Sequence, residues 1–166
     1  MTAKEVQETL VGYRVTHLWS PLAVTAARNT NGIVGWECDL LVVHKSGWAW
    51  EVEIKVSVAD FRRELKEKVL KHKALVEGKC LRKVFGKIVE YGPSYIRQFY
   101  FAMPADVLEK VYDEIPEWAG IIRVENNRAR IERKGKNLPA TKCDDDMRRK
   151  MKDSVYYRFW KGQEVV

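Results

Sequence analysis

Asp39, Glu53 and Lys55 have the residue types that hydrolysis of a phosphodiester bond requires. Carboxylates are hard oxygen ligands that suit Mg²⁺ or Mn²⁺, and such an ion can activate water and stabilise charge on a phosphate. A lysine beside them can steady the attacking hydroxide or the charge that develops on the phosphate. The three residues form a candidate site for metal-dependent hydrolysis, provided that the fold brings them together.

The segments that carry these residues are predicted to form two neighbouring antiparallel strands, at 36–43 and 48–55. Side chains of a strand point alternately to its two faces, and the second segment alternates strictly. One face is apolar, and the other carries Ala49, Glu51, Glu53 and Lys55. Taken alone, this pattern is typical of a half-exposed hairpin whose outer face is charged.

The loop between the two strands decides whether Asp39 and Glu53 meet. A three-residue loop at 45–47 is favoured because its last residue, Gly47, accepts the left-handed conformation that such loops need. This register pairs Asp39 with Glu53 and Glu37 with Lys55, whereas a loop of two or four residues would put Asp39 and Glu53 on opposite faces. Facing carboxylates with β-carbons roughly 5 Å apart repel each other. The register therefore predicts positive charge between them, from Lys55 and from a divalent cation.

Hydrophobic spacing and turn residues predict the other elements. A long helix follows the second strand, with Ser57 as its N-cap, an apolar stripe through Phe61, Leu65, Val69 and Leu70, and Gly78 as its end. The remaining expectations are helices at 3–13 and 105–112, strands at 22–28, 98–103, 120–124 and 128–133, a basic irregular connection at 79–95, and a final helix at about 144–160. This order predicts one α/β (α+β) domain at 1–166, with a central mixed sheet and a core at about 3–133.

Composition limits the classes of partner. The formal charge of +7 and the pI of about 9.3 favour an anionic partner, and DNA is the expectation. No apolar run approaches the roughly 18 residues of a membrane helix, and the N-terminus lacks the apolar core of a signal peptide. We expect an intracellular, cytoplasmic protein of a bacterium or a phage that binds no membrane. No Gly-rich phosphate loop is present, so no nucleotide cofactor is expected.

The helix after the second strand carries many basic residues, which have two interpretations. They can form a solvated amphipathic face, in which Glu64 pairs with Lys68 and Glu67 with Lys71 at four-residue spacing. Alternatively, they contact DNA phosphates beside the site, and the best candidates are Ser57, Arg62, Arg63 and Lys66. The basic stretch at about 77–95 has the same two alternatives, an extra DNA contact or a solvated loop.

Longer blocks around the candidate residues resemble a known family. Asp39 followed by Glu53-Ile54-Lys55 is similar to the signature of the PD-(D/E)xK nuclease superfamily. The flanks resemble the MmcB-like DNA-repair proteins and their phage relatives over about 36–133, in the blocks Val52–Ser57, Ala59–Phe61, Phe99–Pro104 and Ile115–Ile122. Cys38 precedes Asp39 where the superfamily's name has proline, and the stretch at about 77–95 is longer than in the family.

This resemblance implies a restriction-endonuclease-like fold, whose core has the order helix, three strands, helix, strand. It implies a metal-dependent nuclease or nuclease-like DNA-repair factor, with Asp39, Glu53 and the Ile54 carbonyl as ligands of Mg²⁺ or Mn²⁺ and Lys55 as the catalytic lysine. In many members a glutamate on the first helix also serves the metal, and Glu5 and Glu8 are the candidates in this sequence. Two alternatives stay open, a non-catalytic DNA-binding module of a repair or recombination complex, and a resolvase that acts on branched DNA as a homodimer.

Overall fold

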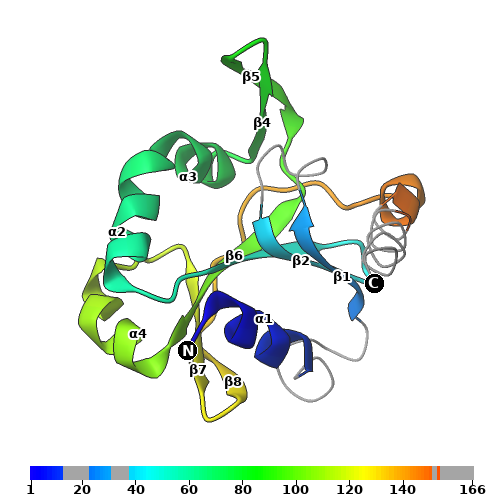
Figure 1. Ribbon diagram of the computed structural model, residues 1–166. Helices are drawn as coiled ribbons and strands as arrows, with labels where there is room; N and C mark the ends of the chain where they lie inside the picture. Colours follow the sequence, from blue (N-terminus) through cyan, green and yellow to red (C-terminus); the bar gives the residue numbers. More distant parts are fainter. Residues whose placement is uncertain (13–22, 31–37, 151–152, 154–166) are drawn as a thin grey trace, which may run out of the picture.

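A six-stranded mixed sheet forms the centre of the computed structural model, which describes residues 1–12, 23–30, 38–150 and 153 (Figure 1). In chain order the elements are α1 (Ala3–Gly12), β1 (Ala23–Thr30), β2 (Cys38–His44), β3 (Ala49–Ile54), α2 (Val58–Glu67), α3 (Val69–Val76), β4 (Lys79–Val84), β5 (Lys87–Pro93), β6 (Ile96–Pro104), α4 (Ala105–Val111), the short 3₁₀ helix η2 (Tyr112–Glu114), β7 (Gly120–Glu125) and β8 (Arg128–Arg133). The predicted α+β class is confirmed.

The strands of the sheet have the order β1-β2-β3-β6-β7-β8. β1, β2 and β3 form an antiparallel meander, after which β6 and β7 run parallel to β3 and β8 turns back antiparallel to β7. Parallel neighbours need a crossover connection, which α2 and α3 provide between β3 and β6 and α4 provides between β6 and β7. Apart from the separate β4–β5 hairpin, and with α2 and α3 counted together, the order helix, three strands, helix, strand runs from α1 to β6.

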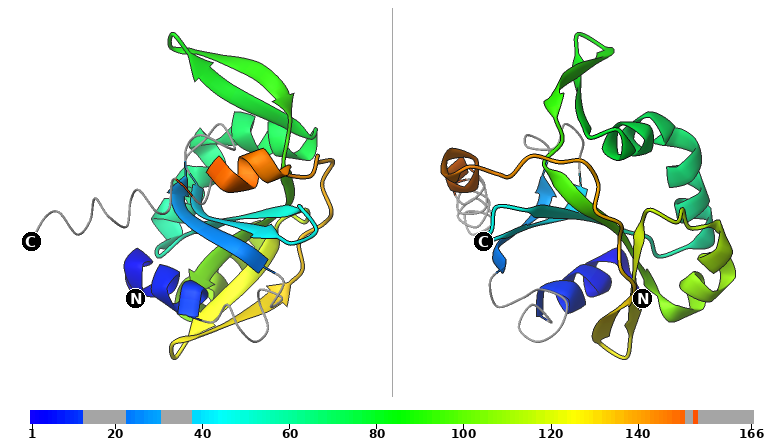
Figure 2. Two further views of the ribbon diagram at one scale, coloured as in Figure 1. Left: turned by 90° about the vertical axis from the view of Figure 1, so that its right-hand side faces the viewer. Right: turned by 180° about the vertical axis from the view of Figure 1, so that it is seen from behind.

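Helices cover both faces of the sheet (Figure 2). Val6 and Leu10 of α1 pack on one face, against Val52 of β3 and Tyr100 of β6 among others. On the opposite face, α2, α3 and α4 bury a second apolar cluster that includes Phe61, Leu75, Phe99, Phe101 and Leu108. Both faces of β3 are consequently covered.

Among the described residues, no helix is long and apolar enough to span a membrane.

The long helix expected at 57–78 is two helices. Ser57 caps α2 as predicted, because its hydroxyl accepts a hydrogen bond of 3.1 Å from the Asp60 N–H. The helix then breaks at Lys68, whose φ of −103° and ψ of 28° are not helical. After this break, Val69 and Leu70 are exposed instead of lying in the apolar stripe, and Lys71 is buried. Lys71 is buried against two carboxylates of β3, those of Glu51 and Glu53.

Residues 79–95, expected to be irregular, form a hairpin of β4 and β5 with its own two-stranded sheet. The helix predicted at 144–160 begins as expected, since residues 145–150 are helical and the Asp144 carboxylate accepts a hydrogen bond of 2.7 Å from the Met147 N–H. Most of its remaining length lies outside the described residues. Cys38, Cys80 and Cys143 are buried and are not joined by disulfide bonds.

Gly78 provides a test of the packing at the end of α3. Its φ is +73°, and a β-carbon there would lie 2.7 Å from the Pro139 side chain. Gly86 has a similar φ of +79°, but a β-carbon there would meet nothing within 4 Å. We expect Gly78→Ala to lower the free energy of unfolding by about 1–3 kcal/mol more than Gly86→Ala does, because only the first substitution adds overpacking to backbone strain. Urea unfolding of both variants measures the difference, and equal losses would contradict the contact with Pro139.

Candidate active site

The loop between β2 and β3 has the predicted length of three residues. His44 and Trp48 close it through a hydrogen bond of 2.9 Å from the His44 N–H to the Trp48 carbonyl, and Gly47 has a φ of +89°. The pairing of Leu40 with Val52 and of Leu41 with Glu51 follows from it. One residue further along the same register, Asp39 faces Glu53. The predicted register is confirmed for the described residues, and Glu37, expected opposite Lys55, lies outside them.

Asp39 lies at the start of β2, and main-chain contacts hold it in place. Its carboxylate accepts a hydrogen bond of 2.7 Å from the Ile54 N–H, and Gln7 of α1 donates to its carbonyl oxygen at 2.8 Å. Burial, and then the negative charge of Glu53, raise the pKa of the Asp39 carboxyl group. A cation between Asp39 and Glu53 would relieve this repulsion.

The charged face of β3 is buried rather than half-exposed. Glu51, Glu53 and Lys55 are each at most 6% exposed, because α2 and α3 cover them. The interpretation of this pattern as a half-exposed hairpin with a charged outer face is therefore wrong. Buried charges are costly unless they are paired, and the pairing comes from the covering helices.

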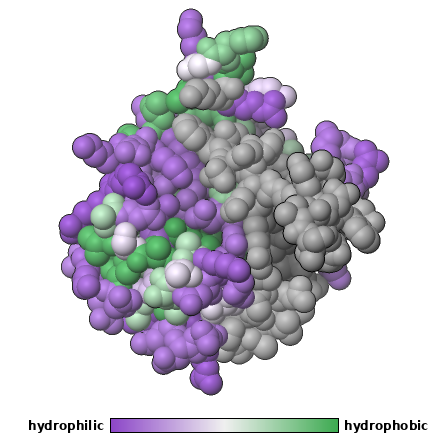
Figure 3. Space-filling view, viewed as in Figure 1, coloured by the Kyte–Doolittle hydropathy of each residue, from purple (hydrophilic) through white to green (hydrophobic). Residues whose placement is uncertain are grey.

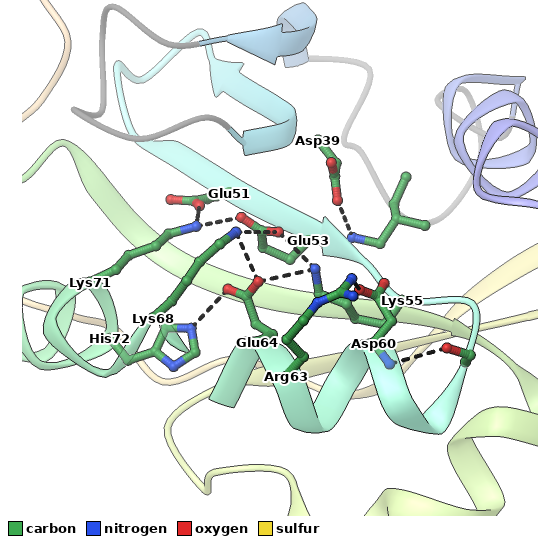
Figure 4. Close-up of polar contacts among 12 residues, drawn as sticks. Asp39, Glu51, Glu53, Lys55, Asp60, Arg63, Glu64, Lys68, Lys71 and His72 are labelled. Atoms are coloured by element: carbon green, nitrogen blue, oxygen red, sulfur yellow. Dashed lines mark hydrogen bonds and ion pairs between the residues drawn. The ribbon is translucent and has the colours of Figure 1, made fainter. Parts of the chain in front are cut away.

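Glu53 lies at the centre of a buried network of ion pairs (Figure 4). Lys71 of α3 contacts Oε1 of Glu53 and also binds Glu51 at 2.5 Å. Lys55 and Lys68 contact Oε2 of Glu53 at 3.2 Å and 3.5 Å. The carboxylate that was expected to bind a metal is thus surrounded by ammonium groups.

Glu64 of α2 is a second acceptor of the same network. Its carboxylate lies 3.1 Å from Lys55 Nζ, 2.8 Å from Lys68 Nζ and 3.3 Å from His72 Nε2. Lys55 and Lys68 therefore share two carboxylates, Glu53 and Glu64. The main chain also fixes Lys55, because its N–H donates to the Ala102 carbonyl of β6 at 3.0 Å.

The network distributes its charges unevenly. Burial opposes ionisation of Glu53, but Lys71 and the other lysines outweigh it and lower the pKa of this carboxyl group. Burial raises the pKa of Glu51 to about 7, since Lys71 only partly offsets it. Burial alone would lower the pKa of Lys55, yet Glu53 and Glu64 raise it, so this ammonium group stays charged.

Four residues of the network were not predicted from the sequence to belong to the site: Glu64, Lys68, Lys71 and His72. Glu64 and Lys68 do form the expected pair at four-residue spacing, but it is part of the network and not of a solvated face. Lys71 binds Glu51 and Glu53, so the expected surface pair with Glu67 is wrong. The spacing of 64, 68 and 71 on one helical face was the signal that these residues point the same way.

The residues of α2 proposed to contact phosphate lie apart from this network. Ser57 caps the helix, Arg62 binds Glu114 with its closest atoms at 2.6 Å, and Arg63 binds Asp60 at 2.5 Å. Arg62, Arg63 and Lys66 are exposed, so this side of α2 faces solvent while Lys55 is buried.

The first helix does not bring a glutamate to the site. Glu5 is exposed and accepts a hydrogen bond of 2.6 Å from the Thr2 N–H, while Glu8 lies 3.9 Å from Lys4. Gln7 is the residue of α1 that contacts β2 beside Asp39. The expectation that Glu5 or Glu8 serves a metal is not supported.

The carboxylate oxygens of Asp39 and Glu53 are donors of the type that a divalent cation such as Mg²⁺ prefers. In the part of the chain that the structure describes, no group of three His, Cys, Asp or Glu side chains is arranged to hold a metal ion. Asp39, Glu53 and the Ile54 carbonyl would therefore have to share the ion with water and substrate phosphate, as Mg²⁺ sites commonly do. Lys68 is one third exposed, so it can withdraw from Oε2 of Glu53 and leave this oxygen to the ion and to Lys55.

Comparison with known proteins supports the fold. No family model matches the chain, and no curated protein matches it significantly. Among solved structures, the chain is similar to the SPO1766 protein of unknown function from Silicibacter pomeroyi, with a TM-score of 0.50 and 16% sequence identity over 84% of this chain and 77% of that chain. At this identity the similarity concerns the fold alone.

Proposed function

We propose that the protein is a metal-dependent DNA nuclease of the PD-(D/E)xK type that acts in DNA repair or DNA processing inside the cell. The observation that carries this proposal is that Asp39 faces Glu53 across β2 and β3, while Lys55 contacts Glu53 at 3.2 Å. Apart from the β4–β5 hairpin and the division of the helix into α2 and α3, the order of elements from α1 to β6 is the one that the superfamily's core would have. A net charge of +7 suits a polyanionic substrate.

Each residue has a separate role in this proposal. Asp39 and Glu53, with the Ile54 carbonyl, hold Mg²⁺ or Mn²⁺, which when bound supplies an activated water and neutralises charge on the scissile phosphate. Lys55 presents a fixed positive charge to the attacking oxygen or to the phosphate. Glu64 and Ala102 orient Lys55, through its ammonium group and its N–H respectively. The DNA backbone is contacted by the exposed side chains of Arg62, Arg63 and Lys66. Ser57, which caps α2, is a fourth contact in this proposal.

One observation favours a non-catalytic DNA-binding module instead. Both oxygens of Glu53 contact lysine ammonium groups, so the charge of this carboxylate is already neutralised without a metal. In that case the network would be a structural element, and the protein would bind DNA for a partner enzyme.

Cleavage of labelled single-stranded, duplex and branched DNA with Mg²⁺ or Mn²⁺ separates the two functions, and the matched variant is Asp39→Asn. Asparagine keeps an oxygen that can accept from the Ile54 N–H but removes the charge that would bind the ion. We expect metal-dependent cutting by the natural protein and a loss of at least about 100-fold in the variant, the scale of removing one electrostatic element. The circular dichroism spectrum of the variant controls for folding.

Absence of cutting on every substrate, with DNA binding intact, would contradict the nuclease and support the binding module. Cutting that Asp39→Asn does not reduce would also contradict it, because the activity would then come from another site or from a contaminant.

A further inference from the structure

The β4–β5 hairpin stands apart from the central sheet and projects from the body of the protein, at the top of Figure 1 and in both views of Figure 2. Val84 pairs with Lys87, and Phe85 and Gly86 form the turn at the tip. A β-carbon built on Gly86 or Gly92 would meet no atom within 4 Å. Strands of six or seven residues extend about 20 Å, so the tip lies well outside the core.

The tip exposes an aromatic ring. Phe85 is fully exposed, and Val84, Ile88, Val89 and Tyr91 are exposed large hydrophobic residues of the same hairpin. Figure 3 shows hydrophobic and hydrophilic residues side by side on this projection. Phe85 has a φ of +47°, a left-handed conformation that is unfavourable for a residue with a β-carbon. An exposed apolar hairpin in a strained turn invites aggregation unless it serves to bind something.

The charge of the hairpin indicates what it binds. Lys79, Arg82, Lys83 and Lys87 against Glu90 give it a net charge of +3. The Arg82 guanidinium of β4 lies 3.9 Å from the centre of the Tyr91 ring of β5. A cation and an aromatic ring are therefore stacked on the two strands of the hairpin. Aromatic faces combined with positive charge are the surface that binds unpaired bases and their phosphates. An apolar protein partner would gain nothing from the excess of lysine and arginine.

The base of the hairpin adjoins the buried network. Glu51 and Lys71 line a small cavity together with Lys79, Cys80 and Leu81 of β4. The hairpin therefore starts beside Glu51 and Lys71 of the buried network and carries Phe85 about 20 Å away from them. A single nucleic-acid strand that is bound along the hairpin would run from its tip toward the buried network.

We propose that the β4–β5 hairpin is a nucleic-acid-binding element, in which Phe85 stacks on an unpaired base and the basic residues contact the adjacent phosphates. This inference shares with the proposed nuclease function the expectation that DNA is bound, but it requires neither a metal nor cleavage. Because Phe85 can stack only on an unpaired base, the inference predicts a preference for DNA with unpaired bases over continuous duplex. The proposed function leaves this preference open.

Binding to fluorescent single-stranded and duplex DNA, measured in EDTA, tests the proposal with Phe85→Ser and Phe85→Trp. We expect Phe85→Ser to weaken binding of single-stranded DNA by about 5-fold to 100-fold, the loss of one base–aromatic stack, and to leave duplex binding unchanged. Phe85→Trp should retain the affinity of the natural protein. Leu70→Ser removes an equally hydrophobic, 54% exposed residue from α3 and should change neither affinity. Single-stranded RNA is the third arm, and it shows whether the sugar matters.

Phe85→Ser that binds single-stranded DNA and RNA as tightly as the natural protein would overturn the proposal. A dimer in solution that Phe85→Ser dissociates, with DNA binding unchanged, would also overturn it and assign the hairpin to a second copy of the chain. Failure of the nuclease is a distinct result, because a protein that never cuts DNA can still lose single-strand binding in Phe85→Ser.

Discussion

Replacement of Lys71 by methionine should lower the free energy of unfolding by about 3–5 kcal/mol, the loss expected when one partner of a buried ion pair is removed. Lys71 is 1% exposed and contacts both Glu51 and Glu53. Methionine fills much of the same space, so the effect comes from the uncompensated carboxylates and not from a cavity. Urea unfolding followed by circular dichroism gives the free energies.

Two further variants show that the effect comes from charge. Lys66→Met changes an exposed lysine of α2 and should stay within about 0.5 kcal/mol of the natural protein. Glu51→Gln added to Lys71→Met removes one of the two carboxylates and should recover part of the stability. A Lys71→Met protein as stable as the natural one would show that Lys71 is not buried against Glu51 and Glu53.

Replacement of Lys55 by methionine should reduce the single-turnover rate of DNA cleavage by about 100-fold to 1000-fold, the effect of removing one preorganised charge from a transition state. Lys68→Met should leave the rate within about tenfold of the natural one. The two lysines are a matched pair, because both contact Glu53 and Glu64 at 2.8–3.5 Å. A purely structural role in the network would predict similar losses for both.

Rates should be compared at saturating metal and with equal amounts of folded protein, which near-ultraviolet circular dichroism reports. Equal loss of activity in Lys55→Met and Lys68→Met would contradict a catalytic role that belongs to Lys55. Full activity in Lys55→Met would remove this residue from the mechanism altogether.

Much of the fold could be predicted from local patterns. Alternation in 48–55 predicted β3 and the face of each of its side chains, and Gly47 predicted the loop that pairs Asp39 with Glu53. Ser57 predicted the start of α2. These signals are strong because backbone conformation and side-chain direction depend on near neighbours in the sequence.

The remaining features depend on contacts between distant segments. Alternation shows which residues share a face of β3 but not whether a helix covers that face, so burial of Glu51 and Glu53 could not be inferred. The helix breaks at Lys68, Lys71 contacts these carboxylates, and Val69 and Leu70 are exposed despite their apolar spacing. β5 is exposed over most of its length, and a strand without a buried face leaves no periodic pattern to recognise.

Calorimetric titration with Mn²⁺, in the absence of DNA, tests most directly whether Asp39 and Glu53 form a metal site. We expect the natural protein to bind Mn²⁺ and Asp39→Asn to bind it at least about tenfold more weakly, a loss of about 1.4 kcal/mol. Lys68→Met should bind Mn²⁺ more tightly, because a competing ammonium group has been removed from Glu53. No binding by the natural protein, or equal affinity in Asp39→Asn, would contradict the metal-dependent site.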